Sequence, residues 1–84
     1  MMKRIGAYIL MDIEISKTDE VVSKLREIEQ ARRISVTTGD YDIVLLLDVQ
    51  DLEELYDITV QKIAHIPGIR ETTTSVVEKV IAKE

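Results

Sequence analysis

The sequence predicts two strands, at residues 5–15 and 41–49, that are apolar on both faces. In residues 5–15, Ile9 and Met11 alternate with Tyr8 and Leu10, so both sets of period-2 positions are apolar until Asp12. In residues 41–49, apolar residues again occupy both sets. A strand that is apolar on both faces is covered on both faces. A fold for this chain must therefore cover both sides of its sheet.

The other elements follow from helical periodicity and turn signals. Residues 18–30 predict a helix with Thr18 as its N-cap, and residues 51–66 predict a second helix that Pro67 and Gly68 end. Residues 31–38 and 69–81 predict strands, and Gly39-Asp40 predicts a hairpin turn before the strand at 41–49. The order βαββαβ predicts one domain over residues 1–84. Its class is α+β and ferredoxin-like, with a four-stranded antiparallel sheet and two helices on one face.

The second face of this sheet has no covering element in the chain. The helices cover one face, and the other carries Tyr8, Leu10, Val44 and Leu46. An exposed apolar patch of this kind usually marks an interface. A chain of 84 residues also buries a limited share of its surface by itself. The sequence therefore predicts a homodimer packed sheet against sheet through these four residues, a dimeric α/β barrel.

Composition excludes several classes of site. The chain has no cysteine and one histidine, which excludes disulfides, thiolate-held metals and a multi-histidine metal site within one chain. The net charge is −5 and the basic residues are scattered, whereas nucleic-acid binders carry a basic face. We find no signal peptide and no apolar run that approaches a membrane span. We therefore expect a cytoplasmic protein with no metal, no cofactor, no membrane association and no direct DNA binding.

No catalytic constellation is visible in the sequence. His65 lies at the predicted end of the second helix, where a cation is favoured, and no orienting carboxylate is signalled beside it. The hydroxyl run at residues 72–75 is either ordinary strand sequence or a set of donors and acceptors for a small polar ligand.

Two carboxylates flank Tyr41 at the hairpin. Asp40 is explained by the turn that it forms with Gly39. Asp42 falls inside an apolar strand, on the face of Val44, and a carboxylate there needs a partner. Two hypotheses remain open, a fixed group such as an arginine and the ammonium group of a ligand.

Two motifs resemble one protein family. Residues 36–42 read V-T-T-G-D-Y-D and residues 66–77 read I-P-G-I-R-E-T-T-T-S-V-V. Both resemble the RAM domain, which is the effector domain of the Lrp/AsnC family of transcription regulators, and the resemblance spans about residues 5–79. It implies the same βαββαβ order, dimerisation through the sheets, rings of dimers, and amino acids bound in clefts between dimers.

The resemblance also implies a ligand site. By position, the implied ligand-binding residues are Gly39, Asp40, Tyr41, Asp42, Thr72, Thr74, Val76 and Ala64. Asp42 would receive the ammonium group of an amino acid, and the turn backbone at Gly39 or the Thr74 hydroxyl would receive its carboxylate. Typical members carry a helix-turn-helix domain before this one, but the first predicted strand begins within a few residues of Met1. We expect a stand-alone RAM protein that acts by assembling with DNA-binding relatives.

Two alternatives share the predicted topology. One is an enzyme on a dimeric ferredoxin-like barrel, of isomerase or monooxygenase type, which needs polar residues between sheet and helices. The predicted helix-facing positions are all apolar, so we expect no enzyme activity. The other is a regulatory ACT-type domain, which lacks the T-G-D-Y-D motif.

Overall fold

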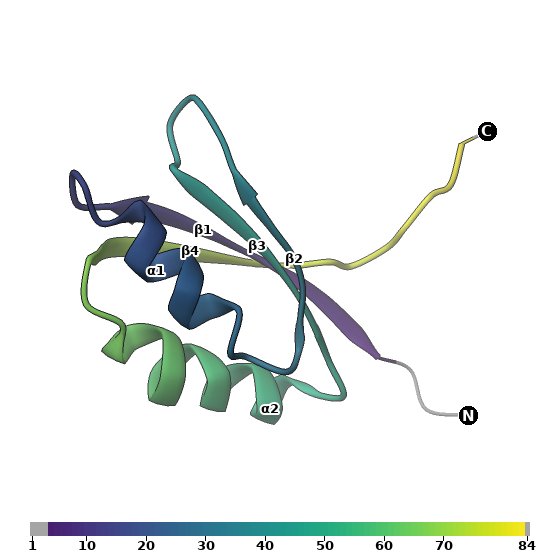
Figure 1. The fold of residues 1–84 in the computed structure, drawn as a ribbon. Coiled ribbons are helices and arrows are strands. Elements are labelled where there is room, and N and C mark those ends of the chain that lie inside the picture. The colour runs from purple at the N-terminus through teal and green to yellow at the C-terminus, as the bar shows by residue number, and fades with distance from the viewer. Residues whose placement is uncertain (1–3, 84) are drawn as a thin grey trace.

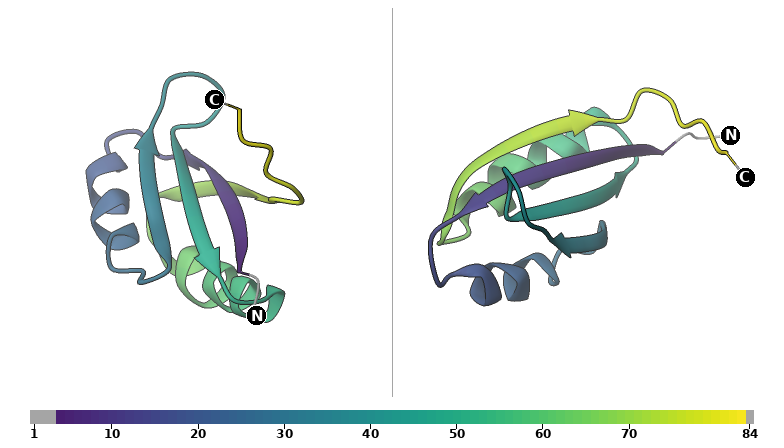
Figure 2. Two further views of the ribbon diagram at one scale, coloured as in Figure 1. Left: turned by 90° about the vertical axis from the view of Figure 1, so that its right-hand side faces the viewer. Right: turned by 90° about the horizontal axis from the view of Figure 1, so that it is seen from above.

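The two segments that are apolar on both faces form the centre of the sheet. β1 (Ile5–Ile13) pairs antiparallel with β3 (Ile43–Val49), while β2 (Ala31–Val36) flanks β3 and β4 (Ile69–Val76) flanks β1. The computed structural model describes residues 4–83, and Figure 1 shows its strands and helices. α1 (Thr18–Leu25) and α2 (Leu52–Asp57) cover one face of the sheet, as Figure 2 shows. The predicted ferredoxin-like βαββαβ fold is confirmed.

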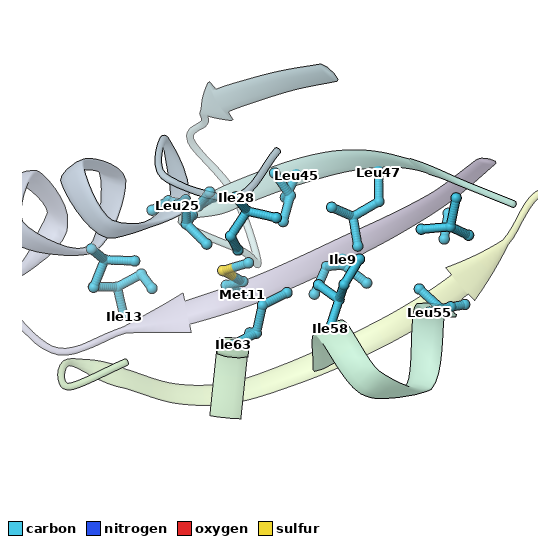
Figure 3. Packing of buried hydrophobic residues seen from close by; sticks show 14 residues of the cluster. Ile9, Met11, Ile13, Leu25, Ile28, Leu45, Leu47, Leu55, Ile58 and Ile63 are labelled. Carbon is cyan, nitrogen blue, oxygen red and sulfur yellow. The ribbon is translucent and has the colours of Figure 1, made fainter. Parts of the chain in front are cut away.

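The core lies between the sheet and the helices. Alternate residues of β1 and β3 point into it, including Ile9, Met11 and Leu45, which are fully buried (Figure 3). Val21 and Leu25 of α1 meet them from the helix layer. Burying each aliphatic side chain of this size stabilises the fold by about 1.5–3 kcal/mol. Among the described residues, no polar or charged residue is buried, so apolar packing dominates the contact between the layers.

The second helix changes its winding to keep one face buried. After α2, a π-helical turn (η1, Ile58–Lys62) and a 3-10 turn (η2, Ile63–His65) continue to the loop. Ile58 and Ile63 are five residues apart and both buried, which suits the wider π turn better than a regular α-helix. Helical spacing in the sequence predicts a buried stripe of Leu52, Leu55, Thr59, Ile63 and Ile66, and Leu55 and Ile63 are indeed buried. The prediction is wrong for Leu52, which is 59% exposed.

The first helix is shorter than residues 18–30. It ends at Leu25, and tighter turns follow, in which the N–H of Ile28 donates to Leu25 O at 3.0 Å and the N–H of Ala31 donates to Ile28 O at 3.1 Å. Ile28 is still buried in the core. Thr18 is the first helical residue and not the predicted N-cap, since Lys17 precedes the helix without a side-chain capping bond.

The last strand ends at Val76 and not at residue 81. The N–H of Val77 donates to Gly6 O at 2.8 Å, and Gly6 is already next to the first residue of β1. Residues 77–83 continue as an extended stretch that leaves the sheet, which we call the trailing segment (Figure 1).

Candidate functional site

The open face of the sheet, which no helix covers, has an apolar centre. Tyr8 lies directly opposite Leu46, and Leu10 lies directly opposite Val44, on the paired central strands. Tyr8 is 42% exposed, and the other three side chains are half-buried within one chain. The four residues predicted as a dimer interface are therefore contiguous on one surface. That a second copy covers them stays a prediction.

The two ends of the open face carry opposite charge. At one end, Asp48 accepts from Arg4 Nε at 3.0 Å and from Arg32 Nη1 at 3.2 Å. We call this the basic end, because it has more cations than anions. At the other end, Asp12 of β1 lies opposite Glu71 of β4, and Asp42 adjoins β1 on the other side. We call these three carboxylates the acidic end.

The β2–β3 hairpin is longer than the predicted two-residue turn. β2 ends at Val36 and β3 begins at Ile43, so residues 37–42 form the connection. Gly39 has φ +114°, a conformation that side chains with a Cβ rarely adopt. The loop is closed by Thr37, whose N–H donates to Asp42 O at 2.9 Å and whose hydroxyl donates to Tyr41 O at 2.6 Å.

Asp42 has a partner in the backbone of β1. Its Oδ2 accepts from the N–H of Ile13 at 2.8 Å, and its own N–H donates to Met11 O at 2.8 Å. The N–H of Ile13 points toward β3, as the carbonyl of Met11 does, and it is free to bond this side chain because the β1–β3 ladder ends at the pair Met11–Ile43. The suggested arginine partners are therefore replaced by a backbone amide. Reading this contact from the sequence would have required the strand register.

The other implied ligand residues lie elsewhere in the chain. Thr72, Thr74 and Val76 are opposite Met11, Ile9 and Ala7, so they share the helix-side face of the sheet. These three β4 residues are exposed because they lie on an edge strand.

The hairpin and β4 groups are separated within one chain. Met11 pairs with Ile43 on one side and with Thr72 on the other, which puts Thr72 two strand spacings, about 10 Å, from the start of β3. Ala64 is exposed in η2, as is His65. One chain therefore does not gather the eight residues into one cleft.

The region where an enzyme of this topology would hold its substrate is filled. The helix-facing side chains of Ile9, Met11, Ile43, Leu45 and Leu47 have no exposed area. None of the helices in the described chain is long and apolar enough to cross a membrane.

Comparisons with known proteins agree with these features. The model of the Lrp/AsnC ligand binding domain matches residues 6–84. An uncharacterised HTH-type transcriptional regulator of Pyrococcus abyssi is 37% identical over 76 residues, which are 90% of this chain and 48% of that protein. The chain thus spans about half the length of the curated relatives that it matches.

Solved structures share the fold. FFRP-DM1 superposes with a TM-score of 0.83 and 29% identity, covering 87% of this chain and 97% of that one. The crystal structure of a Neisseria meningitidis transcriptional regulator in complex with L-Met has a TM-score of 0.87 and 18% identity, covering 94% and 53%. With the family model matched over nearly its whole length, the chain belongs to the Lrp/AsnC family and corresponds to the ligand-binding domain of that family.

Proposed function

We propose that this chain is an amino-acid-binding regulatory module, which forms homo-oligomers and modulates transcription by assembling with DNA-binding relatives. The observation that carries the proposal is the match to a ligand-binding domain over residues 6–84. The matched relatives are HTH-type transcriptional regulators, which supports a regulatory function.

The proposed ligand site lies between copies of the chain. The hairpin residues Gly39 to Asp42 and the exposed residues of β4 are too far apart to enclose a small molecule within one chain. A neighbouring dimer in a ring would supply the second wall. One oxygen of Asp42 accepts from Ile13, and a carboxylate has further acceptor positions for an ammonium group. The exposed Thr74 side chain offers a hydroxyl for the carboxylate of the ligand.

A thermal-shift screen of the twenty standard amino acids tests ligand binding. L-methionine is a suitable first ligand, because a structural neighbour is an L-Met complex. A ligand present at about 100 times its dissociation constant should stabilise the protein by about 2.7 kcal/mol. For a domain of this size, that corresponds to a rise of roughly 10–20 °C in melting temperature. A melting temperature that stays constant with every amino acid at millimolar concentration would contradict the proposal.

We expect these 84 residues alone not to bind DNA with sequence specificity. The net charge of −5 opposes the phosphate contacts that supply most non-specific affinity. A gel-shift assay at physiological salt, with a helix-turn-helix relative as positive control, measures this. Saturable nanomolar binding to a defined site by this chain alone would refute the expectation. Adding the chain to the DNA-bound relative should change the mobility of that complex if the two co-assemble.

A further inference from the structure

The trailing segment carries two adjacent apolar residues that its own domain does not cover. Val80 is 80% exposed and Ile81 is 78% exposed. The segment leaves the sheet on the side away from the helices, which is the side of the open face (Figure 2). An isolated exposed apolar residue is ordinary, but here an apolar pair projects beside a larger apolar surface.

A hollow of about 420 Å³ separates the trailing segment from the open face. Tyr8 and Leu46 line it from the sheet, Val77 and Val80 line it from the trailing segment, and Asp48 lies at its basic end. The trailing segment therefore borders the open face across this hollow and does not pack directly against it.

The charges at the two ends of the open face select one orientation for a second copy. If the strands of the second copy run in reverse, its acidic end lies over the basic end of the first copy. If the strands run in the same direction, like charges face one another, which is unfavourable. The trailing segment begins beside Gly6, which pairs with Asp48 at the basic end. In the reversed arrangement it therefore starts opposite the acidic end of the second copy, and Lys79 and Lys83 outnumber Glu78, so the segment brings a net positive charge.

The segment is long enough to reach that copy. Packed sheets lie about 10 Å apart and extended residues rise about 3.3 Å each, so three or four residues span the gap. Residues 77–83 therefore leave Val80 and Ile81 at or just beyond the crossing. We propose that the trailing segment of each copy crosses to the second copy and packs Val80 and Ile81 against it. The proposal rests on the sheet-to-sheet dimer that belongs to the proposed function.

The first test changes only the apolar pair. The double substitution Val80→Lys/Ile81→Lys lies in an extended segment outside the core, so folding should be unaffected. By sedimentation, we expect the dimer dissociation constant to rise about tenfold or more, as two covered aliphatic side chains become charged. Leu52→Lys/Tyr56→Lys is the control, because it places the same two charges at exposed positions of α2 and should leave the dimer unchanged.

The outcomes separate the two proposals. If the wild type is a dimer and the double substitution changes the dimer dissociation constant by less than about twofold, the crossing is overturned but the dimer is not. A monomeric wild type overturns the dimer and the crossing together.

A second test distinguishes crossing from folding back. Because the chain has no cysteine, Ala82→Cys accepts a single nitroxide label on the trailing segment. Labelled copies are mixed with isotope-labelled copies that carry no nitroxide, and only the latter are observed by NMR. We expect strong paramagnetic broadening of amides at the acidic end, such as that of Glu71. In a second sample, the nitroxide-bearing chain is itself isotope-labelled. If broadening appears only on the open face of that chain and not on the other copy, the crossing is overturned.

Discussion

Leu46→Lys is expected to convert the assembled protein into monomers. Leu46 lies at the centre of the open face, opposite Tyr8 on one side and Arg33 on the other. An ammonium group there would be buried without a partner in the dimer, and it would lie beside a like charge. The cost of an unpaired buried charge is about 3–5 kcal/mol, which raises the dissociation constant roughly a hundredfold to a few thousandfold. Sedimentation velocity at micromolar concentration measures the change.

Two comparisons make the result specific. Leu52→Lys makes the same chemical change at an exposed position of α2 and should remain dimeric. In the monomeric chain, Leu46 is half-buried, so Leu46→Lys should still fold and keep its circular dichroism spectrum. An unchanged dimer in Leu46→Lys would mean that the open face is not the interface.

Asp42 is expected to respond differently to two substitutions. Asp42→Ala removes the acceptor for the N–H of Ile13 and leaves that half-buried donor unpaired, which should lower stability by about 1–3 kcal/mol. Asp42→Asn keeps an oxygen for Ile13 and should melt close to the wild type. It loses the charge, however, and with it a charge-assisted bond of about 1.5–3 kcal/mol to the ligand ammonium group. Amino-acid affinity should then fall roughly tenfold to a hundredfold.

Melting curves without ligand and calorimetric titration of all three proteins separate these effects. If Asp42→Asn binds the amino acid as tightly as the wild type, Asp42 is a structural residue of the hairpin alone. Glu53→Gln is the control, because it removes one carboxylate charge at an exposed position of α2, away from the hairpin.

The sheet and its apolar surfaces were predictable because they depend on period-2 alternation. Tyr8, Leu10, Val44 and Leu46 could be assigned to one surface from parity alone, and the structure places them as directly opposed pairs. Burying one face of both strands fixes the face on which each residue lies, and the structure adds the register that pairs them.

Features that depend on register or on helix winding could not be predicted in this way. The contact between Asp42 and Ile13 arises because the β1–β3 ladder ends at the pair Met11–Ile43, an end point that no local residue pattern marks. Ile58 is buried three residues after Leu55, and the π turn then keeps Ile63 on the same face five residues later, a spacing that a regular 3.6-residue repeat does not produce. The end of β4 at Val76 follows from where its neighbour begins and not from its own sequence, which stays rich in β-branched residues.

The anchoring of the hairpin on β1 has a thermodynamic consequence. Asp42 bonds to two backbone groups of β1, at Met11 and Ile13, and the same strand carries Tyr8 and Leu10 on the open face. One rigid element thus connects the proposed ligand site to the proposed interface. A ligand that favours one placement of this strand would change the affinity between copies, and by linkage the assembly would change the ligand affinity by the same factor. The concentration of the protein would then itself set the amino-acid level to which it responds.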